Sequence, residues 1–160
     1  MKFEIGKVIM HKTLGLCTVI DMVDRDEMPY YKLQTYHSPH SLLLVPKRGE
    51  NTTCREVMSR EDVDDLLEYM KTMEANFNLH NKQKKESYTR MLHSNDPKQL
   101  AQLSRSLYLY KEEKRLKKQI LSLEDTHLFQ QAATHLHNEI AYVYGIDRED
   151  VIEFISNRLN

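Results

Sequence analysis

Polar side chains recur every four residues near the end of the chain, a spacing that could in principle hold a metal ion. The stripe consists of His127, Gln131, His135 and Glu139. On a helix these side chains would share one side. However, His137 points the opposite way from His135, and the HExxH pattern of zinc enzymes is absent from the sequence. A polar or interfacial stripe therefore explains these residues better than a metal centre, and we expect no bound metal.

Sequence patterns that bind nucleotides or activate a nucleophile are also absent. The chain has 4 glycines, and none lies in a GxGxxG, GxxxxGK or GxSxG pattern, which cradle phosphates or expose a nucleophile. The carboxylates of residues 61–65 open a predicted helix, where the helix dipole favours negative charge. Cys17 and Cys54 lack a CxxC spacing and are expected to be unpaired, partly buried thiols. We therefore predict no catalytic residues, no cofactor and no small-molecule substrate.

A block of cationic residues gives the strongest chemical signal. Residues 81–118 hold 11 Lys and Arg against 4 Asp and Glu, whereas residues 51–80 hold 3 against 7 and residues 119–160 hold 2 against 7. Because like charges repel, such clustering is best tolerated where a polyanion binds it. Cations contact backbone phosphates without a fixed motif and without reading base sequence. The cations assigned to DNA are Lys82, Lys84, Lys85, Arg90, Lys114 and Arg115.

A solvated helix face is the alternative explanation of the basic block. Lys and Arg near a helix C-terminus stabilise the helix dipole, and Glu112 and Glu113 offer pairing partners along the same helix. Under this alternative the protein would be an adaptor that binds another protein without direct DNA contact. Direct binding to a DNA fragment distinguishes the two functions.

The elements that must position these residues begin with strands. Val, Ile, Thr, Tyr and Leu dominate up to about residue 46 and are separated by short polar stretches, which favours β-structure. Strands are predicted over Lys7–Met10, Leu16–Val23, Tyr30–Tyr36 and Ser41–Val45. Four or five short strands in fewer than 50 residues predict a small, SH3/Tudor-like bent sheet or barrel.

From about residue 55 the apolar period becomes helical and remains so to the end. Helix start signals are Ser59 with Asp62, Asp96 before Pro97, Ser122 with Asp125, and Asp147 with Asp150. Gly145 is expected to cap the penultimate helix. The predicted fold class is α+β: a β domain over residues 1–52, followed by an all-α domain of four to five helices over residues 53–160.

Length and composition agree with a globular protein. The chain has 160 residues, of which 40% are hydrophobic and 29% charged. The strictly apolar runs, such as Leu42–Val45, are far shorter than the roughly 20 residues that a bilayer span requires. The charged start is unlike a signal peptide. We expect a cytoplasmic protein with no membrane partner.

The order of these segments resembles a known family, the bacterial CarD/CdnL-type regulators. The part that resembles their RNA polymerase-interacting domain, also found in the transcription-repair coupling factor, comprises Phe3–Gly15, Val19–Asp21, Tyr30–Leu33, Leu43–Pro46 and Arg55–Val57. The part that resembles their helical DNA-binding domain comprises Leu92–Ala101, Arg105–Tyr108, Lys114–Leu116 and Leu121–Ser122. Single motifs are moderately specific, but their joint order and spacing cover the whole chain.

The resemblance implies a non-enzymatic transcription regulator that modulates open-complex formation. Its β domain would dock on the RNA polymerase β subunit by strand pairing, and its helical domain would meet double-stranded promoter DNA near the edge of the bubble. The residues implied for polymerase binding are Arg25, Tyr31, Leu33, Leu42 and Leu44. Leu44 replaces a second arginine that family members carry, so this docking surface would be less charged.

A second departure from the family concerns its wedge tryptophan. Family members often carry a tryptophan at the start of the first basic helix, whereas this chain has no Trp and matches Asn81 to that position. Phe77 and His80 are the nearest aromatic rings. A ring at a fork replaces base stacking, which is worth roughly 1–3 kcal/mol, and asparagine cannot do so. We therefore expect weaker bubble stabilisation, unless Phe77 or His80 substitutes.

Overall fold

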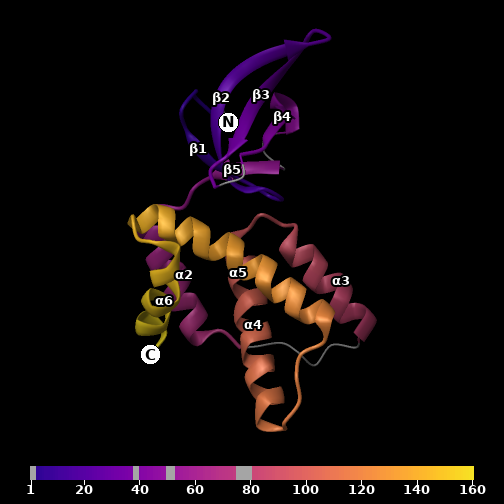
Figure 1. The fold of residues 1–160 in the computed structure, drawn as a ribbon, viewed down its shortest axis with the longest axis vertical. Coiled ribbons are helices and arrows are strands. Elements are labelled where there is room, and N and C mark those ends of the chain that lie inside the picture. The colour runs from indigo at the N-terminus through magenta and orange to yellow at the C-terminus, as the bar shows by residue number, and fades with distance from the viewer. Residues whose placement is uncertain (1–2, 38–39, 50–52, 75–80) are drawn as a thin grey trace. The chain divides into compact units, whose positions relative to one another are not determined.

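The computed structural model describes residues 3–37, 40–49, 53–74 and 81–160 (Figure 1). The chain divides into two compact units, Met1–Val57 and Met58–Asn160. Within the described residues, the first unit is a five-stranded antiparallel sheet and the second contains five α-helices. The predicted α+β class, with a sheet followed by a helical domain, is confirmed.

The sheet of the first unit has the strand order β4-β3-β2-β1-β5. Its strands are β1 (Val8–His11), β2 (Gly15–Arg25), β3 (Met28–Thr35), β4 (Leu42–Pro46) and β5 (Cys54–Glu56). The first four agree with the predicted strands to within a few residues. β5 was not predicted, because three residues are too few for an alternating pattern; it pairs antiparallel with β1 through Ile9↔Glu56 and His11↔Cys54.

A two-residue turn joins β2 to β3. Arg25 pairs with Met28, and both intervening residues, Asp26 and Glu27, have positive φ angles of 50° and 65°. Positive φ at both central positions is typical of the hairpin turn that matches the twist of adjacent strands. The turn therefore fixes the register between β2 and β3, and Arg25 lies next to the turn at the loop end of this hairpin.

The helical unit contains α2 (Arg60–Thr72), α3 (Asn81–Leu92), α4 (Pro97–Leu116), α5 (Leu123–Tyr144) and α6 (Val151–Leu159). The predicted caps hold at Ser59, Asp96 and Ser122, whose side chains accept backbone N–H groups of the first turn. Gly145 ends α5 with a left-handed φ of 64°. At α6 the predicted start signal is only approximate: a 3-10 turn, Arg148–Asp150, precedes the helix, and in this described segment neither Asp147 nor Asp150 makes a side-chain cap.

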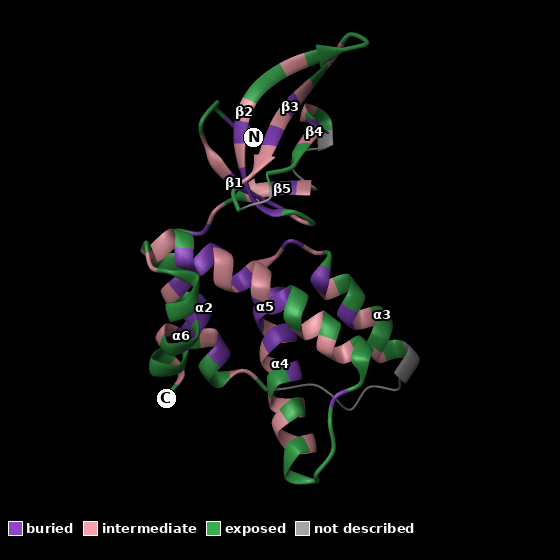
Figure 2. Cartoon of the chain, in the orientation of Figure 1, coloured by how far each residue is buried: buried purple, intermediate pink, exposed green. Residues whose placement is uncertain are grey.

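Two apolar cores lie on either side of the α4–α5 pair. One core packs α2 and α6 against α5 and includes Val63, Leu67, Ile140, Val151 and Ile155. The other packs α3 against the middle of α4 and α5 and includes Tyr88, Leu92, Leu103, Leu107 and Ala132. The last turns of α4 and the connection after it are mostly exposed (Figure 2). The basic end of α4 is therefore presented to solvent by a helix whose first half is buried.

Candidate functional site

A groove of about 320 Å³ lies on the β unit at the position expected for polymerase binding. Three of the five residues assigned to that contact line it, namely Arg25, Leu42 and Leu44, together with Lys32. Arg25 and Leu42 are exposed, and Lys32 pairs with Leu44 across β3 and β4. The lining also includes the Asp24 carboxylate, so two cations and one anion lie beside apolar side chains. This arrangement suits a partner surface that combines apolar groups with a small excess of acidic ones.

Tyr31 and Leu33 lie in the core of the β unit instead. Their side chains are 1% and 0% exposed, respectively. The Tyr31 hydroxyl accepts a hydrogen bond from the Phe3 amide at 3.1 Å, and the two rings lie 5.6 Å apart. Because side chains alternate along a strand, burial of Tyr31 and Leu33 is what turns Lys32 toward the groove. We therefore assign Tyr31 and Leu33 a supporting role and not direct contact.

Strand β4 forms an edge of the sheet. Within the described part of the sheet it has one neighbour, β3, and the register runs from Tyr30↔Pro46 to Gln34↔Leu42. An edge strand carries backbone N–H and C=O groups that can pair with a strand of another chain. Pro46 lacks an N–H and therefore cannot donate at the end of this edge. The groove and the edge together form the candidate protein interface of this unit.

Lys84 lies between three helices and not on an open face. Its Nζ is 2.9 Å from Asp125 Oδ2 on α5 and 4.2 Å from the centre of the Tyr110 ring on α4. The side chains of Lys84 and Asp125 are only 12% and 14% exposed. Burial, with a smaller contribution from the Asp125 charge, raises the pKa of the neighbouring Tyr88 to about 12. Because these contacts join α3, α4 and α5, we assign Lys84 a structural role.

Lys85 is paired but accessible. Its Nζ is 2.8 Å from Glu124 Oε1, and the two side chains are 66% and 68% exposed. The hydrogen bond to Glu124 raises the pKa of Lys85. Exposed ion pairs contribute about 0–1 kcal/mol, so a phosphate can replace Glu124 as the partner of Lys85 at little cost.

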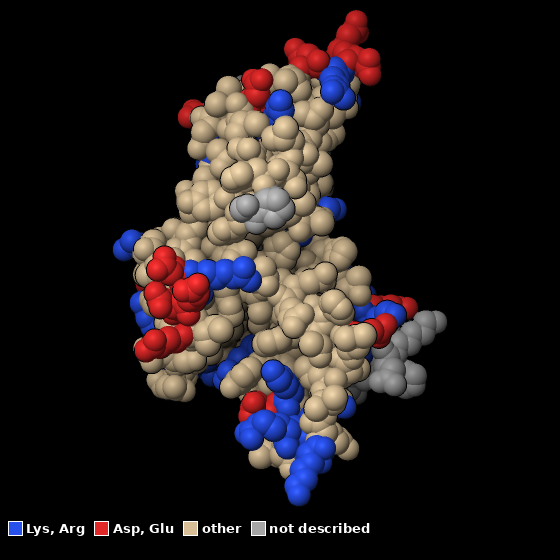
Figure 3. All heavy atoms as spheres, viewed as in Figure 1, with Lys and Arg blue, Asp and Glu red and all other residues tan. Residues whose placement is uncertain are grey.

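The C-terminal end of α4 carries the densest group of cations (Figure 3). Two of them are paired along the helix: Arg115 Nη2 is 2.9 Å from Glu112 Oε2, and Lys117 Nζ is 3.2 Å from Glu113 Oε1. Lys114 Nζ lies 5.2 Å from the centre of the Tyr110 ring. The predicted pairing of Glu112 and Glu113 is therefore present, yet Lys and Arg still outnumber the carboxylates at this end. Lys114 and Arg115 belong to this group.

The remaining residues assigned to DNA lie on α3. Arg90 is exposed in the last turn of that helix. Asn81 and Lys82 begin α3, but their side chains lie outside the described part of the chain. Phe77 and His80 lie entirely outside it. The structure thus brings Lys85 and Arg90 onto one helix and Lys114 and Arg115 onto the next.

One residue of the polar stripe on α5, Glu139, has a structural role. Glu139 is buried, and its Oε1 accepts a hydrogen bond from the Met58 amide at 2.9 Å, just before the cap of α2. Among the described residues there is no group of three or more His, Cys, Asp or Glu side chains that could hold a metal ion. His137 is partly buried, and this burial, with a smaller contribution from the Arg148 charge, lowers its pKa.

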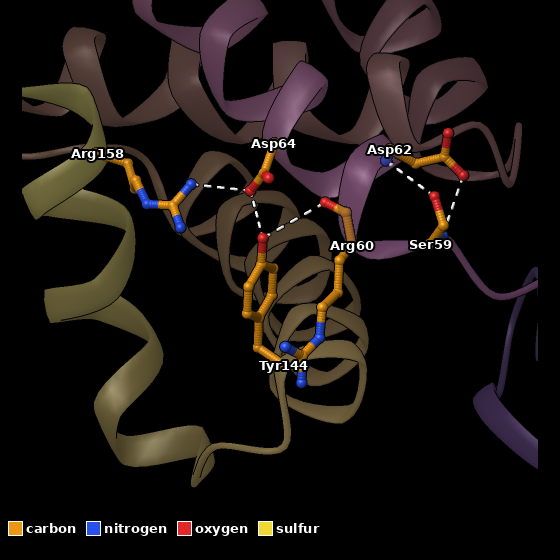
Figure 4. A network of polar contacts seen from close by, with 6 residues as sticks. All are labelled: Ser59, Arg60, Asp62, Asp64, Tyr144 and Arg158. Atoms are coloured by element: carbon orange, nitrogen blue, oxygen red, sulfur yellow. Dashed lines mark hydrogen bonds and ion pairs between the residues drawn. The ribbon is translucent and has the colours of Figure 1, made fainter.

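A network that the sequence analysis did not identify joins α2, α5 and α6 (Figure 4). Asp64 on α2 accepts hydrogen bonds from the Tyr144 hydroxyl and, at 2.8 Å, from Arg158 Nη1 on α6. These two bonds, the first more than the second, lower the pKa of Asp64. The Arg60 guanidinium lies 5.1 Å from the centre of the Tyr144 ring. The network fastens the last helix to the unit and is accounted for without a ligand.

Comparison with known proteins places the helical unit in a family. The family model described as the C-terminal domain of CarD matches residues 65–156, which is more than half of the chain. No curated protein matches the chain. Among the described residues, none of the helices is both long and apolar enough to cross a membrane. The family match agrees with the resemblance found in the sequence, and the chain therefore belongs to the CarD family of non-enzymatic, transcription-related proteins.

Proposed function

We propose that this protein binds RNA polymerase through its β unit and promoter DNA through its basic helices, and thereby modulates open-complex formation. The observation that carries the proposal is the group of accessible cations on α3 and α4 of a CarD C-terminal domain. Each phosphate that such a surface neutralises releases condensed counterions. Promoter double-stranded DNA near the bubble edge is the proposed ligand, and Lys85, Arg90, Lys114 and Arg115 are its proposed contacts.

The polymerase contact is assigned to the groove and the β4 edge. Pairing of β4 with a strand of the polymerase β subunit would supply main-chain hydrogen bonds, and Arg25, Leu42 and Leu44 would supply specificity. Holding polymerase and DNA with one chain raises the local concentration of each ligand for the other site. Weak single contacts therefore suffice for a tether of this kind.

The DNA contact is tested by the salt dependence of binding. The triple variant Lys85→Ala, Arg90→Ala, Lys114→Ala should lower affinity for a promoter duplex. Because each lost phosphate contact reduces the slope of log K against log salt by about 0.9, the slope should fall by about 2.7. Lys71→Ala, an exposed lysine of α2, is the matched control and should bind as the wild type does. Fluorescence anisotropy at several salt concentrations measures both quantities.

The polymerase contact is tested separately. Arg25→Glu and Leu42→Glu should each reduce capture of core RNA polymerase by the full chain. Ile5→Glu alters an exposed apolar residue of the same unit and should leave capture unchanged. If both groove variants still capture core RNA polymerase as the wild type does, the groove is not part of the polymerase interface.

A protein-only adaptor is the second candidate function. The pairing of Lys84 and Lys85 with Asp125 and Glu124 favours it, because these lysines already have acidic partners. An adaptor would retain polymerase capture and show no affinity for a forked promoter fragment at low salt. If the wild type binds that fragment and the triple variant does not, the DNA-binding function is supported and the adaptor function is excluded.

A further inference from the structure

Two ion pairs join adjacent residues of α3 to adjacent residues of α5, and they differ in burial. Lys84 and Asp125 are nearly buried, whereas Lys85 and Glu124 are mostly exposed. Successive residues of a helix point about 100° apart, so Lys84 lies between the helices while Lys85 lies toward solvent. The first pair therefore holds the helices together, and the second is accessible to a ligand.

The start of α5 holds the Glu124 carboxylate close to Lys85. Glu124 and Asp125 are the acidic residues in the first turn of that helix, where the helix dipole favours negative charge. The Asp125 amide also donates to Ser122 Oγ at 3.1 Å, which fixes the turn. Because the buried pair and this cap hold α5 against α3, the Glu124 carboxylate remains near Lys85 when their own ion pair opens.

A carboxylate and a DNA phosphate offer the same chemistry to an ammonium group. Both are oxygen anions that accept short, charge-assisted hydrogen bonds. In the free protein Glu124 Oε1 accepts such a bond from Lys85 Nζ at 2.8 Å. A phosphate must displace Glu124 before it can bind Lys85, and the displaced carboxylate then lies near the negative charge of the DNA. Both effects lower the affinity of this surface for DNA.

The acidic residues of α4 pair in a different way. Glu112 and Glu113 bind Arg115 and Lys117, which follow them by three and four residues on the same helix. Such pairs follow from the spacing of a single helix. Glu124 instead reaches its lysine from a second helix, 39 residues away in sequence. Its pairing is therefore set by the packing of α3 on α5.

We propose that Glu124 is an internal competitor for Lys85 that lowers the affinity of the chain for DNA. This inference rests on the proposed DNA-binding function and adds a regulatory residue to that site. An exposed ion pair is weak, so the competitor reduces the affinity without preventing binding. A chain tethered to polymerase binds DNA nonetheless, because its local concentration at the promoter is high, whereas a free chain at low concentration remains largely unbound.

A double-mutant cycle for DNA affinity tests the competitor. Full-length wild type, Glu124→Gln, Lys85→Met and the double variant are titrated by fluorescence anisotropy against one promoter-length duplex at constant salt. Glu124→Gln should bind the duplex about 3- to 5-fold more tightly, the range expected when one exposed pair is lost. In the Lys85→Met background the same substitution should change the affinity little, because the lysine for which Glu124 competes is absent.

Glu86 provides a matched control. This residue is exposed on α3, next to Lys85, and has no ion pair within the described part of the chain. Glu86→Gln removes the same charge without releasing a lysine. Any gain in affinity from this change should therefore be the same in the wild-type and Lys85→Met backgrounds. Urea denaturation followed by circular dichroism shows whether each variant is folded.

The outcomes separate the competitor from the proposed function. If the wild type does not bind the duplex even at low salt, the DNA-binding function fails and the inference with it. If the wild type binds DNA but Glu124→Gln does not bind more tightly, the inference alone is overturned. An equal gain from Glu124→Gln in both backgrounds would assign the effect to overall charge and would also overturn the inference.

Discussion

Replacing Lys84 by methionine is expected to destabilise the helical unit while leaving DNA binding intact. Methionine keeps an apolar stem but removes the ammonium that lies 2.9 Å from Asp125 and 4.2 Å from the Tyr110 ring centre. Breaking a buried ion pair costs about 3–5 kcal/mol, whereas an exposed pair contributes about 0–1 kcal/mol. With side chains 12% and 14% exposed, this pair lies nearer the buried limit. We expect a loss of about 2–3 kcal/mol of the free energy of unfolding, including the cation–π contact.

A double-mutant cycle isolates the interaction. Lys84→Met, Asp125→Asn and the double variant should give a coupling energy of about 1–3 kcal/mol. Asp125→Asn keeps the backbone N–H that donates to Ser122 Oγ at 3.1 Å, so the cap of α5 survives. The matched cycle of Lys85→Met with Glu124→Gln removes a pair of the same charge types that is 66% and 68% exposed. Its coupling energy should be much smaller than that of the Lys84–Asp125 cycle, because solvent screens an exposed pair.

Urea denaturation of the full chain, followed by circular dichroism, measures the free energies for both cycles. Anisotropy titration with a promoter duplex then asks whether each lysine contributes to DNA affinity. Lys85→Met should weaken DNA binding and Lys84→Met should not. Equal coupling energies in the two cycles would refute the structural role of Lys84. Loss of DNA affinity in a Lys84→Met variant of unchanged stability would refute it as well.

Two other predictions concern the hairpin turn and the network on α2. Glu27→Gly should stabilise the β unit by about 0.5 kcal/mol in denaturant titrations, because Glu27 has a φ of 65° that glycine adopts without strain; Asp24→Gly, within β2, should destabilise it instead. The hydrogen bonds from Tyr144 and Arg158 lower the pKa of Asp64 in the folded protein. The ionised Asp64 therefore stabilises the folded state at pH values above its unfolded-state pKa of about 3.9. This stabilisation is lost as the pH falls through the lower pKa that Asp64 has in the folded state. The protection factors of α6 amides, which are corrected for the intrinsic pH dependence of exchange, should therefore fall on acidification in the wild type. Asp64→Asn should remove that decrease, and an equally steep decrease in the variant would exclude Asp64 as its source.

Local sequence signals were sufficient for most elements of this fold. Ser59, Asp96 and Ser122 each precede a helix and accept hydrogen bonds from its first turn, so a cap can be identified from neighbours in the sequence. The alternation in β3 likewise separates buried Tyr31 and Leu33 from Lys32. Applied more strictly, this alternation would have placed the Tyr31 and Leu33 side chains in the core of the β unit.

The candidate site was less predictable because its charges pair over long sequence separations. Lys84 and Asp125 are 41 residues apart, and Asp64 and Arg158 are 94 apart. Periodicity places such residues on a helix face but does not say which face meets another helix. Strand β5 escaped prediction for a similar reason, since its pairing with β1 and not its own three residues makes it a strand.

The pairing also limits how strongly salt can act on DNA binding. Four of the 11 cations of residues 81–118 have an acidic partner in the described structure, namely Lys84, Lys85, Arg115 and Lys117. Six others, which the structure describes without an acidic partner, can neutralise phosphates without opening an ion pair, and at about 0.9 per phosphate they account for a slope of log K against log salt of about 5 in magnitude. A steeper slope would mean that Lys82, or a paired cation such as Lys85 or Arg115, contacts a phosphate as well. Because Lys84 is the least exposed of the four, its pair should be the last to open.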